Sequence, residues 1–117
     1  MHKSEVTCIK LSHDGNFVAS GDSMKNVFVW KSSTKEIVNN RFVFHSAKVF
    51  AIDWSSDDTN LVSASLDRSV IVWDVPSKSK VKVFSDMDVE VVTAVTFTNA
   101  KEFICGGHSC GLRRFMY

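Results

Sequence analysis

Three side chains of the types that serve in hydrolytic catalysis occur in the middle of the chain: His45, Ser63 and Asp67. A serine nucleophile, a histidine base and an orienting carboxylate can hydrolyse an ester or an amide when a fold holds them in contact. The same groups, joined by the indole N–H of Trp73, can instead satisfy one another's hydrogen bonds where water is excluded. Residue types alone permit both interpretations, so the elements that carry these residues must decide between them.

A second pattern with catalytic associations is the run GHSCG at residues 107–111, which has the form G-x-S-x-G with Ser109 in the nucleophile's place. An esterase elbow of this form needs a strand before it, a helix after it, and an acid and a histidine further along the chain. Residues 112–117 contain neither an acid nor a histidine and are too few for a helix. We therefore interpret the run as a turn between two strands, and we predict that the chain has no catalytic residue and is not an enzyme.

Cysteine and histidine also occur together near the end of the sequence, as Cys105, His108 and Cys110. Structural zinc takes four ligands, and no fourth candidate lies close by. We predict no metal and no cofactor, and we assign Cys105 to a strand as a small core residue. The three cysteines are an odd number without the spacing of a disulfide framework, which favours free thiols in a cytoplasmic protein.

The strongest pattern in the sequence is an internal repeat of 43 residues. Val6, Val49 and Val92 are spaced by this interval, and so are Trp30 and Trp73. Each unit contains three short segments rich in β-branched and aromatic residues, separated by polar turn residues, with room for a fourth strand between units. The repeat therefore predicts an all-β fold in which each unit forms one small antiparallel sheet.

Several of the predicted strands are apolar at consecutive rather than alternate positions, as in residues 27–30 (VFVW) and 70–73 (VIVW). Such strands belong to a sheet that is buried on both faces. A propeller blade meets this condition because it lies between two neighbouring blades. Four strands in a repeat of about 40–45 residues is also the propeller period.

In order and spacing, His45, Ser63, Asp67 and Trp73, followed by Asp74, resemble the WD repeat. The resemblance implies that the first four side chains form a hydrogen-bonded ladder across one blade, which is a structural role rather than a catalytic one. It also implies the fold class: an all-β, partial WD-repeat β-propeller of about three blades of short antiparallel strands, the last blade incomplete. The ladder should be partial in the first unit, which has Ser23 near the aspartate position, and absent from the third, which has Phe115 in place of tryptophan.

A narrower resemblance is to the last blades of the actin-interacting protein 1 family. It rests on the runs SHDGNFVASGD at residues 12–22, HSAKV at 45–49, WSSD at 54–57 and LD at 66–67. The resemblance implies a non-catalytic protein-interaction module that helps cofilin to disassemble actin filaments, with the cytoplasm, including its cytoskeleton, as its location. Actin filaments and cofilin-type proteins are the implied partners. A generic WD-repeat scaffold for a different protein complex stays open as the alternative.

Charge and hydropathy argue against two other classes of partner. Lys and Arg together number 14 and Asp and Glu 13, so the net charge of +1 offers no broad field for nucleic acid. The longest apolar stretches are four residues, far below the roughly 18 needed to cross a bilayer. We therefore predict neither a nucleic-acid nor a membrane partner.

Candidate contacts to a protein partner are basic residues in or near the predicted turns. Lys25, Lys48 and Arg68 fall in predicted loops at residues 24–26, 45–48 and 66–69. Arg113 and Arg114 interrupt an apolar strand, and their long side chains can carry the charge to the rim of a blade. Arginine is enriched in protein interfaces, so a partner contact is the alternative for these two.

We treat residues 1–117 as one partial propeller with repeat units 1–44, 45–87 and 88–117. Propellers usually need at least four blades to close, and an open array exposes two apolar faces. The chain therefore needs further blades, from a longer chain or from self-association. We favour a piece of a longer chain, because the third unit resembles the C-terminus of the family named above.

Overall fold

The computed structural model describes residues 5–42, 45–77, 79–84, 92–99, 102–107 and 112–116, and within these ranges eleven β-strands form three antiparallel sheets. The first sheet contains β1 (Val6–Leu11), β2 (Phe17–Asp22), β3 (Val27–Lys31) and β4 (Ile37–Phe42). The second contains β5 (Val49–Trp54), β6 (Asn60–Ser65), β7 (Val70–Asp74) and β8 (Ser79–Phe84). The third contains β9 (Val92–Asn99), β10 (Glu102–Gly107) and β11 (Leu112–Met116). The predicted fold class, an all-β partial propeller, is confirmed.

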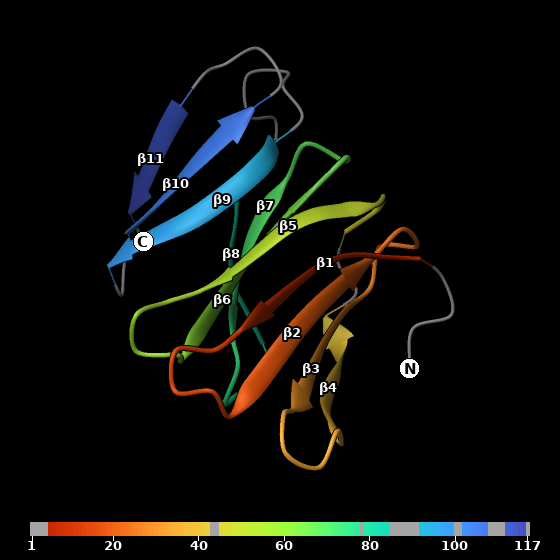
Figure 1. The fold of residues 1–117 in the computed structure, drawn as a ribbon. Coiled ribbons are helices and arrows are strands. Elements are labelled where there is room, and N and C mark those ends of the chain that lie inside the picture. The colour runs from red at the N-terminus through yellow and green to blue at the C-terminus, as the bar shows by residue number, and fades with distance from the viewer. Residues whose placement is uncertain are drawn as a thin grey trace.

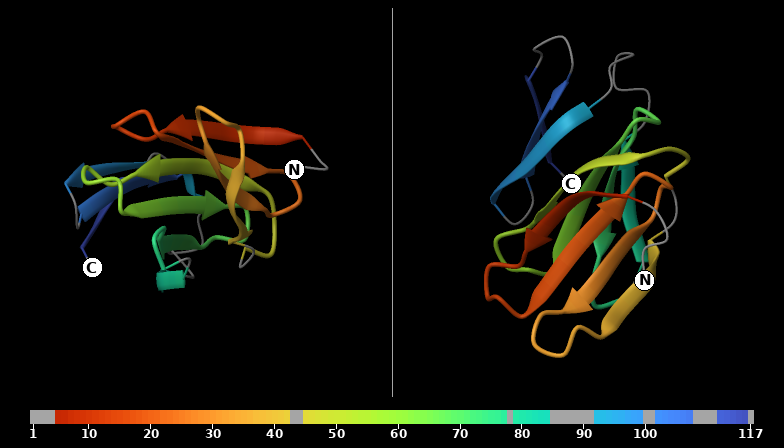
Figure 2. Two further views of the ribbon diagram at one scale, coloured as in Figure 1. Left: turned by 90° about the horizontal axis from the view of Figure 1, so that it is seen from below. Right: turned by 45° about the vertical axis from the view of Figure 1, so that its right-hand side comes forward.

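Successive sheets stack on one another in the order of the sequence. The first strands of the sheets lie side by side, β1 against β5 and β5 against β9, and the remaining strands fan outward from them (Figure 1). Figure 2 shows from two further directions that the second sheet is the middle layer. No helix within the described ranges is long and apolar enough to cross a membrane.

The turns that link the first two strands of the first and second sheets repeat the same chemistry. Ser12 donates its hydroxyl to Asp14 at 2.7 Å, and Ser55 donates to Asp57 at 2.6 Å. Each serine also accepts the backbone N–H of the residue that lies five positions later. Gly15 adopts a φ of 77°, a conformation that costs glycine little. The 43-residue period therefore holds in the turns as well as in the strands.

Two apolar cores separate the three sheets. The first lies between the first and second sheets and includes Ala19, Val27, Val29, Val49, Ile52, Trp54, Leu61, Ile71, Trp73 and Val75. The second lies between the second and third sheets and includes Val62, Ala64, Val70, Val72 and Phe103. All six residues of β6 are buried, as its position in the middle layer requires. In contrast, β1 is mostly exposed, because no described residue packs on the outer side of the first sheet.

Polar contacts across the cores fix how the sheets lie against one another. The Thr7 hydroxyl donates to the carbonyl oxygen of Val49, and the Trp54 indole N–H donates to the carbonyl oxygen of Lys10 at 3.0 Å. Between the second and third sheets, the backbone N–H of Phe97 donates to the Asp53 carboxylate at 2.8 Å. Directional bonds of this kind set a register that apolar packing alone leaves open.

Candidate protein-binding edge

Three loops meet at one edge of the stacked sheets. They are the β2–β3 turn (residues 23–26), the loop that precedes β5 (residues 45–48) and the β6–β7 turn (residues 66–69). We call this the loop edge. Because strands alternate in direction within each sheet, these loops lie on the same side, at the upper right of Figure 1. The loop edge contains three of the five basic residues that the sequence singles out.

The ladder residues lie directly beneath the loop edge, and the structure brings all four together. The Trp73 indole N–H donates to the Ser63 hydroxyl oxygen at 2.8 Å. The same hydroxyl lies 2.7 Å from His45 Nε2, and His45 Nδ1 lies 3.1 Å from Asp67 Oδ2. Since the Ser63 oxygen accepts the indole proton, its own proton is available to Nε2. This arrangement places the histidine proton on Nδ1, where it donates to Asp67.

Asp67 ties two loops of the edge to each other. Its Oδ2 accepts the backbone N–H of Ser46 at 2.8 Å, and its Oδ1 accepts the backbone N–H of Ser69 at 2.8 Å and the Ser69 hydroxyl. The backbone N–H of Leu66 also donates to the carbonyl oxygen of Lys48 at 2.8 Å. This hydrogen bond holds the backbone of Lys48 against the β6–β7 turn. The sequence pattern did not reveal the parts played by Ser46 and Ser69.

The connectivity Ser63–His45–Asp67 is also that of a hydrolytic triad, but its surroundings do not suit catalysis. Ser63 is 0% exposed and His45 2% exposed, so a substrate has no access to either in the described structure. The Ser63 oxygen is already an acceptor for Trp73. Burial and a fully used hydroxyl support the structural interpretation of these residues over the catalytic one.

The two titratable members of the ladder both have lowered pKa values. Burial lowers the pKa of His45 because it disfavours the imidazolium, and the Asp67 carboxylate beside it offsets only part of this effect. Burial alone would raise the pKa of Asp67. Hydrogen bonds from the Ser69 hydroxyl and from the backbone N–H groups of Ser46 and Ser69 stabilise the carboxylate and together outweigh burial, so the pKa of Asp67 lies below its ordinary value. His45 is therefore neutral and Asp67 ionised in the folded protein at pH 7.

Stability should depend on pH through His45. Its folded pKa lies below the unfolded value of about 6.5, so the unfolded chain binds the proton more readily. We expect the free energy of unfolding to be constant above that value and to fall below it, by at most about 1.4 kcal/mol per pH unit. Urea melts between pH 5 and 8 measure this, and the His45→Gln variant should lose much of the dependence. Equal slopes for the two proteins would exclude His45 as the group responsible.

The first sheet has a related but different arrangement at its end of the loop edge. Trp30 donates its indole N–H to Ser20 at 2.9 Å, as Trp73 does to Ser63. Asp22, which is 0% exposed, accepts the backbone N–H groups of Met24 and Asn26 at 2.9 Å each. The sequence pattern pointed to Ser23 for this turn, and the described structure shows Asp22 holding it instead.

The basic residues of the loop edge project from turns with unusual backbone angles. Lys25 and Arg68 are exposed and lie 43 residues apart, with φ values of 71° and 68°. Lys48 places its ammonium 5.5 Å from the centre of the Phe50 ring, a cation–π arrangement. Two apolar side chains are exposed on the same turns, Met24 at 62% and Leu66 at 47%. Cations mixed with exposed apolar groups are suited to a protein partner.

The other predicted site residues lie in or beside the third sheet. Arg113 and Arg114 belong to β11, where their backbones pair with Cys105 and Ile104 of β10. The side chains of both arginines lie outside the described part of the structure, so their contact with a partner stays a prediction. Cys105 lies on a strand, as expected. Residues 108–111 of the predicted turn lie outside the described residues. Among the residues that the structure describes, no group of three or more His, Cys, Asp or Glu side chains could hold a metal ion.

Comparison with known proteins identifies the repeat. The family model described as "WD domain, G-beta repeat" matches residues 1–31 and 37–74. Similar curated proteins are the 66 kDa stress protein of Physarum polycephalum, 31% identical over 96% of this chain, actin-interacting protein 1 of Caenorhabditis elegans, 28% identical over 97%, and Protein HIR1 of Candida albicans, 32% identical over 87%. The chain covers 19%, 19% and 13% of these three proteins, so it spans a fifth or less of the length of each.

The fold is likewise found among solved structures. The WD40 repeats of RRP9 superpose on 99% of this chain with a TM-score of 0.89 at 17% identity, and this chain covers 36% of theirs. At that identity the likeness shows the fold alone. Together with the family match over more than half of the sequence, it shows that the chain belongs to the WD-repeat family and is a WD-repeat protein-interaction module.

Proposed function

We propose that this chain is the non-catalytic, partner-binding part of a cytoplasmic protein that promotes cofilin-dependent disassembly of actin filaments. The observation that carries the binding role is the loop edge, where Lys25, Lys48 and Arg68 lie on one side of the stacked sheets. The likeness to actin-interacting protein 1 over 97% of the chain supports actin filaments and cofilin-type proteins as the partners.

The loop edge is suited to a partner surface that presents acidic side chains beside apolar ones. Two of its cations, Lys25 and Arg68, are exposed, and Lys48 is partly buried. Met24 and Leu66 add exposed apolar side chains on the same turns. The Asp67 carboxylate and the bond from Leu66 to Lys48 hold the two turns of the second sheet before a partner arrives. A surface that is already ordered loses less conformational entropy on binding, which favours affinity.

Filament co-sedimentation with cofilin present tests this function. The folded chain should increase the fraction of actin that cofilin releases to the supernatant, and part of the chain should pellet with the filaments. The absence of both effects from a folded sample would count against the actin role.

Two charge-removing variants test whether the loop edge makes the contact. Lys25→Asn and Arg68→Asn should each weaken binding by about threefold, the scale of one exposed charge pair. Asparagine is chosen because it tolerates the left-handed backbone of both positions. Lys35→Asn is the matched control, since Lys35 is also exposed and has a φ of 62° but lies in the β3–β4 turn at the opposite edge. Equal losses in all three variants would show that the loop edge is not the contact.

A generic scaffold for another complex is the second candidate. The observation in its favour is that Protein HIR1, named differently from the actin-interacting relative, is similar over 87% of the chain. Affinity capture from cell extract separates the two candidates. A bound fraction that contains a partner sensitive to Arg68→Asn, but no actin, would favour the generic scaffold.

A further inference from the structure

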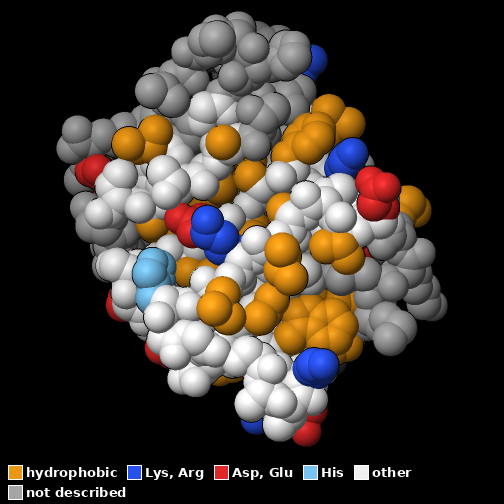
Figure 3. Space-filling view, viewed as in Figure 1, with side chains coloured by type: hydrophobic (Ala, Val, Ile, Leu, Met, Phe, Trp, Pro, Cys, Tyr) orange, Lys and Arg blue, Asp and Glu red, His pale blue; other side chains and the backbone are white. Residues whose placement is uncertain are grey.

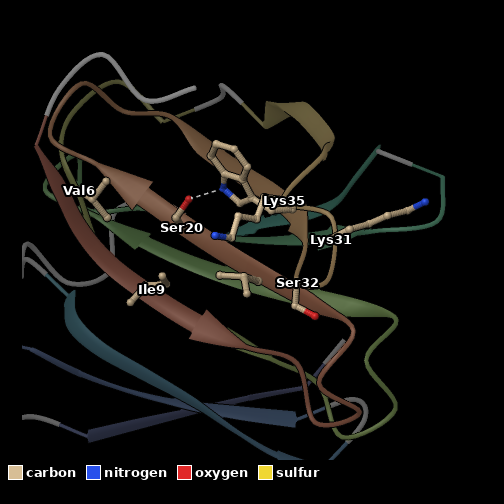
Figure 4. Close-up of a pocket in the computed structure, with 8 residues that line it drawn as sticks. Val6, Ile9, Ser20, Lys31, Ser32 and Lys35 are labelled. Carbon is tan, nitrogen blue, oxygen red and sulfur yellow. Dashed lines mark hydrogen bonds between the residues drawn. The ribbon is translucent and has the colours of Figure 1, made fainter.

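A hollow of about 380 Å³ lies in the outer face of the first sheet, with Ile9 and Trp30 among the residues that line it (Figure 4). Figure 3 shows hydrophobic side chains gathered over the same sheet on the side toward the viewer. The residues 43 positions later, Ile52 and Trp73, lie in the face of the second sheet that the first sheet covers. A face of this kind belongs to the packing of one repeat on the next, so the hollow does not mark a ligand site.

The loop that precedes β5 presents a serine hydroxyl that the fold does not use. Ser46 is exposed, and its backbone N–H donates to Asp67 at 2.8 Å, but its hydroxyl makes no hydrogen bond within the described part of the chain. Serine hydroxyls nearby are engaged instead. Ser65 donates to the carbonyl oxygen of Ala47 at 3.0 Å, and Ser69 donates to Asp67. The backbone of Ser46 is therefore held in place while its hydroxyl oxygen stays free to react.

Two cations of the loop edge are attached to the backbone beside Ser46. Lys48 lies two residues further along the same loop, and Arg68 directly follows Asp67, whose carboxylate holds Ser46. Phosphate oxygens accept short, charge-assisted hydrogen bonds from both kinds of side chain, and the guanidinium group can donate two of them in parallel. A phosphate group on Ser46 would therefore have two cationic partners on turns that are already ordered.

The acidic groups of the loop edge oppose an added phosphate less than these cations favour it. Both oxygens of Asp67 already accept hydrogen bonds, and so does the buried carboxylate of Asp22. Glu5 is exposed on the first sheet, where water and salt screen its charge. Neither Lys48 nor Arg68 is paired with a carboxylate in the described ranges. Their charges are available to a new anion.

We infer that Ser46 is a phosphorylation site, and that its phosphate pairs with Lys48 and Arg68 and so takes these cations from the partner of the loop edge. The Ser46 Oγ forms a bond to the γ-phosphorus of a nucleoside triphosphate in a protein kinase. The bond from that phosphorus to the bridging oxygen breaks, the hydroxyl proton passes to a base of the kinase, and a nucleoside diphosphate leaves. The kinase class is one that recognises a basic residue two positions after the serine, here Lys48.

The added phosphate carries a charge of about −1.5 to −2 at pH 7, which cancels most or all of the positive charge that Lys48 and Arg68 supply. A partner surface with acidic side chains then loses the attraction of the loop edge. This regulatory role rests on the binding role proposed above, whereas the pairing of the phosphate with the two cations does not.

Ser33 provides a matched control within the same chain. It is also exposed, its hydroxyl makes no hydrogen bond among the described residues, and Lys35 follows it two positions later. It lies in the β3–β4 turn, at the edge opposite to the loop edge. A kinase with this preference should modify both serines, but only the phosphate on Ser46 should alter the partner contact.

Phosphorus-31 NMR tests the pairing in the absence of a partner. The Ser33→Ala chain is labelled by a kinase of this class, and mass spectrometry locates the phosphate. The second pKa of an unpaired phosphoserine is about 6. We expect a lower value in the folded chain, because nearby cations favour the dianion, and a value closer to 6 in urea and in the Arg68→Asn variant. Label on Ser33 but not on Ser46 of the unaltered chain, or equal pKa values in all three samples, would overturn the inference.

Filament co-sedimentation with cofilin present tests the regulation. Phosphate on Ser46 should weaken binding by about tenfold, since it engages two cations worth about threefold each, whereas phosphate on Ser33 should change nothing and Ser46→Ala should abolish the response to the kinase. If Arg68→Asn weakens binding but the phosphate on Ser46 does not, the regulatory inference is wrong and the proposed function stands. If the phosphate is paired by NMR and yet neither change weakens binding, the loop edge is not the contact, and both the regulation and the proposed use of this edge fail.

Discussion

Trp54→Ala is expected to lower the free energy of unfolding by about 3–5 kcal/mol, the usual cost of truncating a fully buried tryptophan. Trp54 is 0% exposed and lies in the core between the first and second sheets, with its ring 6.3 Å from that of Phe17. Its indole N–H also donates to the carbonyl oxygen of Lys10 on the neighbouring sheet. The substitution therefore removes a large apolar contact and a directional bond between two sheets at once.

Two further variants separate these contributions. Trp54→Phe keeps most of the ring and loses the bond to Lys10, so it should cost about 1 kcal/mol. Trp30→Ala removes the same side chain from a partly exposed position on the first sheet and should cost clearly less than Trp54→Ala. Urea melts monitored by circular dichroism give all three values. Equal losses for Trp30→Ala and Trp54→Ala would show that the core between the sheets is not where the stability lies.

The order of strands could be predicted from the sequence because the repeat is a physical one. Each sheet needs β-branched and aromatic residues on its strands and serine, aspartate or glycine in its turns, and both recur every 43 residues. The four ladder residues could be placed because their order and spacing resemble the WD repeat, and that resemblance implies the contacts that the structure contains.

Other features were beyond sequence reasoning, each for its own reason. The N–H groups of Ser46 and Ser69 that hold Asp67 belong to the backbone, so almost any residue could supply them. Exposure of β1 could not be told from burial of β5, because both strands carry similar apolar residues and only the neighbouring sheet differs. Asp22 holds the β2–β3 turn, but it stands two positions earlier in its repeat unit than Asp67 does in the next unit. A comparison at the position equivalent to Asp67 therefore misses it.

Ser63→Ala should destabilise the second sheet by about 2–6 kcal/mol, because it leaves two buried groups without their partner at about 1–3 kcal/mol each. The Trp73 indole N–H loses its acceptor, and His45 Nε2 loses its donor. Ser63 is 0% exposed, so bulk solvent does not reach the two groups to replace the hydroxyl. Asp67→Ala removes one end of the same ladder and should cost about 1–3 kcal/mol. Ser77→Ala, on an exposed turn, is the control and should change little.

A double-substitution cycle shows whether the ladder acts as a unit. Trp73→Phe removes the indole N–H, so the serine oxygen no longer has that proton to accept and Ser63→Ala should cost less in this background. A coupling of about 0.5–3 kcal/mol is typical of residues in one hydrogen-bond network. If the two losses were additive, the bond from Trp73 to Ser63 would contribute little to stability. The shared hydroxyl would then matter only through His45, and the ladder would reduce to a histidine–aspartate clamp that joins the two turns of the loop edge.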